Sequence, residues 1–360
     1  MVRLNESVLR ERLQTGFLGI IALAMLLFLL VQARFLMISL VFAIIIFSLT
    51  SDAIHAFSRL KVPNWLATTL ALAFITVGLL WAATAIVAQV NEIVSTAVSY
   101  AERVEDLLPL LLDWLGPNAQ VAVETSLQNV NITGWIRSVA AQASNLLSAV
   151  VLILLFVGFM FTERAWFPLK IERLTQDPEQ ADKVRAIIAS IMRRVNRYLV
   201  VKAVVSGVTA MLIWSVFYLA GLELAAAIAM LTFILNFIPN VGSIIATTLA
   251  ILLALVQTGS VGETAAIGAA CTAIQFLIGN ILDPMLLGQT LRMSAFGIIL
   301  SLAFWGAVWG LPGMFLAVPM MVALMIVCTH IPWLRPVAII LSREGLADDG
   351  LGQPVPAADA

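Results

Sequence analysis

Long runs of apolar residues dominate the chain. A helix that crosses the hydrocarbon core of a bilayer, about 30 Å thick, needs about 20 mostly apolar residues. Two of the runs, 224–256 and 296–330, are interrupted near the middle. The uninterrupted runs are 16–32, 35–50, 66–88, 144–161, 199–220 and 264–286. The pattern predicts an all-α polytopic membrane protein with about six full spans and two broken helical hairpins.

Composition strengthens this prediction and removes other classes of protein. Hydrophobic residues make up 61% of the 360 residues and charged residues only 11%, whereas soluble domains carry about a quarter charged residues. A soluble globular enzyme is therefore excluded. The net charge of −1 leaves no surplus of cations for binding nucleic acid. The first run is longer than the core of a signal peptide, about 7–15 residues, so we expect a retained span.

The distribution of Lys and Arg predicts the orientation, because short cytoplasmic loops are enriched in these residues. Segment 162–198 carries eight of them, and segment 89–143 carries two beside six carboxylates. The eight are Arg164, Lys170, Arg173, Lys183, Arg185, Arg193, Arg194 and Arg197. We therefore expect a multi-pass protein with both termini in the cytoplasm, 162–198 as a cytoplasmic linker and 331–360 as a cytoplasmic tail.

The external segment 89–143 shows the spacing of a coiled coil. Its apolar seam consists of Ile93, Ala97, Tyr100, Val104, Leu107, Leu111 and Trp114. A helix continuing from Leu66 to Leu108 would be about 65 Å long, so it must project beyond the membrane. An oligomer contact and a hairpin that packs on itself are both compatible with this pattern.

The cytoplasmic linker contains a second apolar stripe at helical spacing. It consists of Val184, Ile188, Ile191, Val195 and Leu199, with basic residues off the stripe. This pattern predicts a helix that lies on the inner face of the membrane, and a solvated connector helix is the alternative.

The two interrupted runs break at residues that end helices. The first break spans Asn236–Gly242 and contains a proline, and the second spans Gly310–Gly313. Arms of about 14–18 residues are shorter than the hydrocarbon core, which favours re-entrant hairpins over thin pairs that cross fully. Counting spans, the first hairpin enters from outside and the second from inside. Such an inverted repeat with broken helices is typical of secondary transporters.

Polar residues concentrate in this half of the chain. The residues expected at the substrate or ion site are Asn236, Pro239, Asn240, Gly242 and Ser243 at the first break, Gln275, Asn280 and Asp283 in the intervening span, and Pro312 and Gly313 at the second break. Asn280 and Asp283 are three apart and would share a helix face. Asp283 is a candidate site for a proton or sodium ion, with Asn280 as a neutral ligand. An interfacial position is the alternative for Asp283, and we expect Lys202 and Glu223 to snorkel from span ends.

Candidate chemistry for an enzyme is lacking in the sequence. His55 and His330 stand apart from any cluster of Cys, His or carboxylate residues, and Cys271 and Cys328 lie in apolar runs. No phosphate-binding Gly-x-x-x-x-Gly-Lys-Ser/Thr loop occurs. We therefore expect no enzyme, no metal and no cofactor, and transport energy would have to come from a gradient.

Three motifs in order resemble the autoinducer-2 exporter (AI-2E) family of bacterial membrane proteins. They are FIPNVGSIIA (237–246), GNILDPMLLG (279–288) and WGLPGMFLAVP (309–319), preceded by NRYLVVK (196–202). The resemblance implies an inner-membrane transporter that forms a homo-oligomer. Some members are reported to export the quorum-sensing signal autoinducer-2, and others are assigned sodium/proton antiport. The family's motif positions fall on Pro239, Asn240, Gly242, Asn280, Pro284, Gly288, Pro312, Gly313 and Pro319. Ala246-Thr247-Thr248 departs from the prolines common there in the family, which predicts a straighter outgoing arm.

Together these features predict a spanning scaffold (1–88), an external helical hairpin (89–143), a fourth span (144–161) and a transport half (199–330). The hairpin tips would flank a site for a small polar molecule and gate opposite faces of the membrane by alternating access. A coupling ion, the lipid bilayer and other copies of the chain are the expected partners. Sodium/proton antiport, an uncoupled facilitator and a non-transporting scaffold are the alternatives.

Overall fold

A computed structural model describes residues 6–58, 64–115, 132–287, 293–343 and 345, and nearly all of them are helical. Eight helices in these ranges are long and apolar enough to cross a membrane. They confirm an all-α polytopic membrane protein. The shorter apolar helices include Ala225–Leu235 and Ala295–Trp309, which are the incoming arms of the two interrupted runs.

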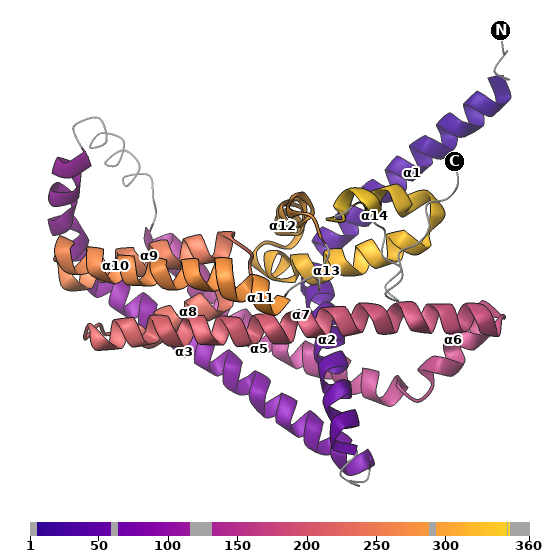
Figure 1. Cartoon of the computed structure of the whole chain (residues 1–360), viewed down its shortest axis with the longest axis horizontal. Coiled ribbons are helices and arrows are strands. Elements are labelled where there is room, and N and C mark those ends of the chain that lie inside the picture. Colours follow the sequence, from indigo (N-terminus) through magenta and orange to yellow (C-terminus); the bar gives the residue numbers. More distant parts are fainter. Residues whose placement is uncertain (1–5, 59–63, 116–131, 288–292, 344, 346–360) are drawn as a thin grey trace.

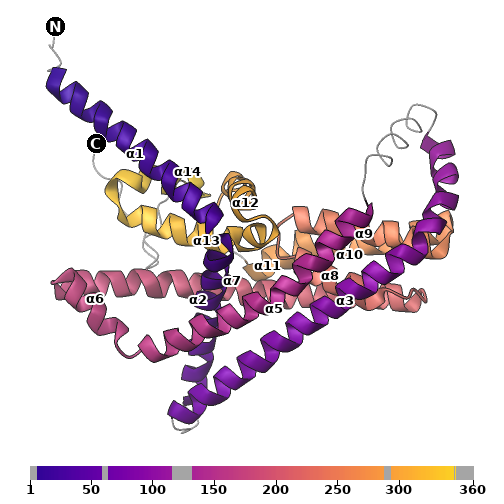
Figure 2. The ribbon, with the colours of Figure 1, turned by 180° about the vertical axis from the view of Figure 1, so that it is seen from behind.

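The N-terminal part consists of α1 (Glu6–Gln32), α2 (Arg34–Ser58), α3 (Asn64–Leu115) and α5 (Ile132–Glu163). α1 projects from the rest of the molecule in both views (Figures 1 and 2), and none of its apolar window Gln14–Gln32 is buried. α3 has 52 residues, which corresponds to about 78 Å of helix. The predicted long helix beyond the third span is confirmed. Segment 116–131, and the seam side chains after Ile93, lie outside the described residues, so the role of the seam stays a prediction.

The linker folds as the short helix α6 (Phe167–Thr175) and the first half of α7 (Pro178–Leu219). α7 begins with Asp177 as its cap, whose carboxylate accepts the Glu179 N–H at 2.9 Å. It then runs unbroken for 42 residues (Figure 1). Val195 and Leu199 are buried in the main apolar core together with α13 residues, and Ile191 packs against it. The prediction that the Val184–Leu199 stripe faces the membrane is therefore wrong, because most of it covers protein.

Both predicted helix breaks are confirmed. The first lies between α8 (Ala225–Leu235) and α9 (Val241–Thr258), and the second between α12 (Ala295–Trp309) and α13 (Leu311–His330). α9 continues without interruption through 246–248, as expected from the lack of prolines there. The arms are unequal: α8 has 11 residues and α12 has 15, against 18 in α9 and 20 in α13.

The two hairpins are connected by α10 (Val261–Leu277), a π-helical turn (Ile278–Leu282) and α11 (Asp283–Leu287). The described chain ends with a 3-10 turn (Pro332–Leu334) and α14 (Arg335–Leu341). The two break regions meet through aromatic side chains. The ring of Phe237 stacks on that of Phe315 with centroids 4.4 Å apart, within the main apolar core.

Candidate functional site

α7 carries buried polar side chains on successive turns. Lys202 is 3% exposed and Ser206 is fully buried, and their spacing of four residues places them on one face of the helix. A polar group held away from water needs a partner, and a charged group needs one most. The partners of Lys202 and Ser206 come from the two places where the neighbouring helices are irregular.

Asp283 is the partner of Lys202. The ammonium Nζ lies 2.7 Å from the carboxylate Oδ2, and the two side chains are 4% and 20% exposed. Lys202 therefore does not snorkel to a membrane surface, and that expectation is wrong. Its ammonium stays inside because α11 places a carboxylate against α7. The ion pair joins residues 81 positions apart in the chain.

A π-helical turn directs the Asp283 carboxylate inward. The Asp283 N–H donates to the carbonyl of Ile278, five residues earlier. Pro284 has no N–H and its ring would clash with the carbonyl four residues before it in a regular helix, and wider turns are a common response to such an obstacle. The turn rotates Asn280 away: its side chain is exposed and donates to the Phe276 carbonyl at 3.0 Å. The expectation that Asn280 and Asp283 share a face is wrong for this reason.

The first hairpin break supplies the partner of Ser206. Asn236, the residue after α8, is 5% exposed, and its amide donates to Ser206 Oγ at 3.2 Å. α7 thus holds Asn236 and Asp283, two of the polar residues singled out in the sequence, through side chains one turn apart. We name Lys202, Ser206, Asn236 and Asp283 the α7 polar cluster.

The remaining predicted residues of the first break shape its turn. Asn240 has φ +58° and ψ −53°, and the Val241 N–H donates to the Pro239 carbonyl at 2.6 Å. This is the geometry of a γ-turn of the rare type. Ser243 donates to the Asn240 carbonyl at 2.9 Å. Gly242 lies against α8, where a Cβ would be 1.7 Å from the Leu235 carbonyl oxygen.

The second hairpin tip is apolar. Gly310 has φ +68°, and Pro312 is exposed in the first turn of α13. Gly313 lies so close to α12 that an added Cβ would be 2.0 Å from the Trp305 carbonyl oxygen. Trp309 donates its indole N–H to the Leu30 carbonyl of α1 at 3.1 Å. Pro312 and Gly313 therefore set the backbone of this tip and lie outside the α7 polar cluster.

Two buried oxygens, one in the cluster and one beside it, lack a hydrogen-bond partner among the described residues. They are Asp283 Oδ1 and the hydroxyl of Tyr198, one turn before Lys202 on the same helix. Gln275 Nε2 in α10 is also buried and unpartnered. Unsatisfied buried polar atoms call for a water, a proton or an ion. Lys202, Ser206 and Tyr198 were not predicted as site residues, although their 198, 202, 206 spacing marks one polar face in an apolar helix.

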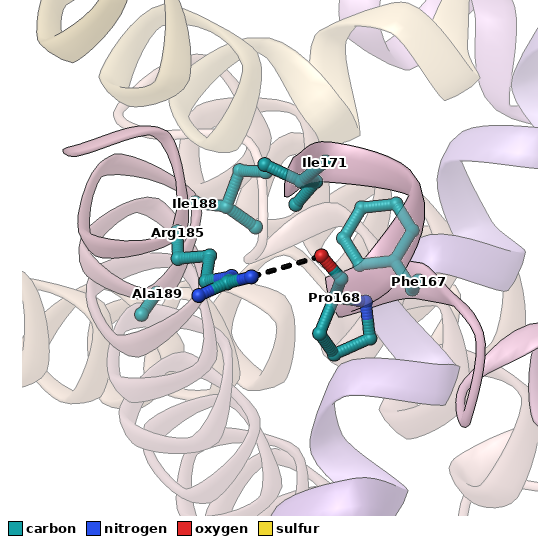
Figure 3. Close-up of a pocket in the computed structure, with 6 residues that line it drawn as sticks. All are labelled: Phe167, Pro168, Ile171, Arg185, Ile188 and Ala189. Carbon is teal, nitrogen blue, oxygen red and sulfur yellow. Dashed lines mark hydrogen bonds between the residues drawn. The ribbon is translucent and has the colours of Figure 1, made fainter. Parts of the chain in front are cut away.

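A hollow of about 200 Å³ lies elsewhere, between α6 and α7 (Figure 3). Its walls are Phe167, Pro168, Ile171, Arg185, Ile188 and Ala189. Within the described ranges, no group of three or more His, Cys, Asp or Glu residues is arranged to hold a metal ion.

The hydrogen bond between Ser206 and Asn236 can be measured directly. Ser206→Ala leaves a buried amide unsatisfied, so we expect it to lower the free energy of unfolding by about 1–3 kcal/mol. Ser206→Ala combined with Asn236→Ala should cost less than the sum of the two single changes. A double-mutant cycle of chemical unfolding in detergent measures this coupling, and strict additivity would contradict the contact.

The fold defines a polytopic helical membrane protein with two broken hairpins and buried ionisable groups on a central helix. A sequence model of the AI-2E family transporter matches residues 20–333, so the chain belongs to the AI-2E transporter family and is no enzyme. It is 28% identical over 346 residues to the AI-2 transport protein TqsA of Escherichia coli (strain K12), covering 91% of this chain and 96% of TqsA. A Haemophilus influenzae relative is 30% identical over 329 residues, 89% of this chain and 94% of its own length.

Proposed function

We propose that this protein is a secondary transporter that exports a small polar molecule, of the class of autoinducer-2, across the bacterial inner membrane by alternating access. One observation carries the proposal: a buried ion pair connects α7 to the π-helical turn beside the first hairpin break. Ionisable residues inside membrane spans typically serve transport or proton relay. The substrate class is suggested by the E. coli relative whose name states AI-2 transport.

In this proposal, both hairpins are re-entrant and belong to an inverted repeat. α8, with 11 residues, corresponds to about 16 Å of helix and cannot cross the hydrocarbon core. The basic end of α7 and both termini lie in the cytoplasm, following the distribution of Lys and Arg. The protein assembles as a homo-oligomer, as the family resemblance implies.

Movement of the hairpins requires contacts that can be broken. Protonation of Asp283 removes its charge, so the attraction that holds α11 to Lys202 is lost. Asn236 is held only one turn away on α7, so the same event changes the support of the first hairpin break. A proton taken up at Asp283 would in this way favour one of the two access states.

Sodium/proton antiport is a second candidate, favoured by the buried and unpartnered Asp283 Oδ1. That oxygen has a free coordination position for a proton or a sodium ion. Export moves a small polar molecule across the membrane, whereas antiport moves sodium ions and protons, so assays on one reconstituted preparation can distinguish the two functions.

We expect Asp283→Asn to abolish transport in sealed liposomes that contain the purified protein. Internal pH is followed after a sodium jump, and entry of labelled autoinducer-2 is followed with and without a pH gradient. Glu263→Gln, an exposed carboxylate in the first turn of α10, is the matched control and should behave as wild type.

Gradient-driven movement of autoinducer-2 that Asp283→Asn removes would support export. A sodium-driven pH change that it removes would support antiport. Movement of autoinducer-2 that is independent of the pH gradient and survives in Asp283→Asn would indicate an uncoupled facilitator. A wild-type protein that moves neither solute, with insertion verified, would contradict transport of both kinds.

A further inference from the structure

α6 joins the end of α5 to the N-terminal end of α7 (Figure 1), and the transport mechanism makes no use of it. The candidate span of α5 ends at Glu163, and α6 begins at Phe167. Four residues of chain reach about 14 Å at most. α6 therefore starts next to the layer of lipid head groups.

Contacts with α7 fix which side of α6 faces outward. Ile171 is buried against α7, and Arg185 of α7 donates to the Pro168 carbonyl at 2.9 Å (Figure 3). Arg185 also pairs with Asp182 and lies 3.7 Å from Glu172, the carboxylate of α6. The acidic side of α6 is thus turned toward α7, and the opposite side cannot rotate inward without breaking these contacts.

The outward side combines large apolar groups with cations. Trp166, Phe167 and Leu174 are 60%, 50% and 82% exposed, and Phe167 lies at the edge of this side because it also lines the hollow between α6 and α7. Lys170 and Arg173 are exposed beside them, and Lys170 also pairs with Glu163 at the end of α5. At 100° per residue, these five positions fall within one sector of the helix and its N-terminal turn, which we name the α6 outer face.

We propose that the α6 outer face binds an anionic phospholipid, with the phosphate group against Lys170 and Arg173 and the glycerol and upper acyl region against Trp166, Phe167 and Leu174. Amphipathic interfacial helices combine basic and aromatic residues in this way, and Trp is enriched at the head-group level of membranes. Exposed apolar area next to cations suits a ligand that is itself apolar at one end and anionic at the other. The proposal is independent of the transport mechanism.

The test uses full-length protein stripped of lipid in detergent and titrated with phosphatidylglycerol or phosphatidylcholine, with bound lipid counted by native mass spectrometry. Wild type should retain phosphatidylglycerol in preference to phosphatidylcholine. Lys170→Gln with Arg173→Gln should weaken phosphatidylglycerol binding about 30-fold, because the variant removes two cations that each contribute on the order of 1 kcal/mol near a membrane. Phosphatidylcholine binding should stay at the wild-type level, which also reports an intact fold.

Two matched variants make the result specific. Lys183→Gln removes an exposed cation on α7 that pairs with Glu179, and it should leave both lipids bound as in wild type. Lys170→Arg with Arg173→Lys keeps the charges and should keep the preference for phosphatidylglycerol. The proposal is overturned if wild type binds both lipids equally, which would assign the face to another kind of partner, or if Lys183→Gln weakens phosphatidylglycerol binding as much as the double change.

Discussion

Asp283→Ala is expected to lower the free energy of unfolding by about 3–5 kcal/mol, the usual cost of removing one partner of a buried ion pair. The change leaves the Lys202 ammonium, whose side chain is 4% exposed, without its carboxylate. Lys202→Met alone leaves the carboxylate instead, and we expect a smaller loss because the Asp283 side chain is 20% exposed. Chemical unfolding of the purified protein in mild detergent measures both values.

The double variant Lys202→Met with Asp283→Ala separates the pair from its parts. Both charges are gone, so no uncompensated ion remains inside, and the double variant should be more stable than Asp283→Ala alone. It should nevertheless fail to transport if the pair is the switch proposed above. A double variant that is as unstable as the sum of the single changes would show that Lys202 and Asp283 act independently.

The helix breaks could be predicted from the sequence because their causes are local. Proline and glycine act on the backbone at their own positions, so residues 236–242 and 310–313 ended helices where expected. The partner of Asp283 could not be predicted in this way. Lys202 is 81 residues away, and only the packing of α11 against α7 brings the two together.

Two other expectations failed because a sequence pattern has more than one physical solution. An apolar stripe such as Val184–Leu199 looks the same whether it covers lipid or protein, and here Val195 and Leu199 cover protein. The placement of Asn280 and Asp283 on one face assumed 3.6 residues per turn. Pro284 is the residue in the sequence that argues against a regular turn of 3.6 residues here, because a proline disturbs the helical turn before it.

The structure also changes the picture of where the hairpins meet. The hairpin tips are expected from the sequence to flank a site for a small polar molecule, and the contact between the break regions is aromatic, through Phe237 and Phe315. The polar groups lie instead on α7, beside the first break and the π-helical turn. Apolar packing can slide between two arrangements with little change in hydrogen bonding, whereas the ion pair has a definite bound and unbound state. Apolar contact between the hairpins together with an ion pair on α7 suits a gate whose movement is controlled by the ion pair.

Gly242→Ala is expected to have the second large effect, lowering the free energy of unfolding by about 3 kcal/mol, at the upper end of the cost of overpacking. An added Cβ would lie 1.7 Å from the Leu235 carbonyl oxygen and 2.6 Å from its carbon. Both atoms belong to the backbone at the end of α8, so no side chain can move aside. The start of α9 must shift, and the γ-turn at Asn240 and the Asn236 contact with Ser206 shift with it.

Gly207→Ala provides the matched control, because a Cβ there meets nothing within 4 Å. Gly207 lies inside α7, so replacing it with alanine should leave the free energy of unfolding unchanged or raise it by up to about 1 kcal/mol. Gly313→Ala should resemble Gly242→Ala, since its Cβ would lie 2.0 Å from the Trp305 carbonyl oxygen. If Gly242→Ala unfolds and transports like Gly207→Ala, the close approach of α8 and α9 cannot be a requirement of the fold. If Gly242→Ala is destabilised and also loses transport at a temperature where it remains folded, the close packing of the first hairpin is required for movement as well as for stability.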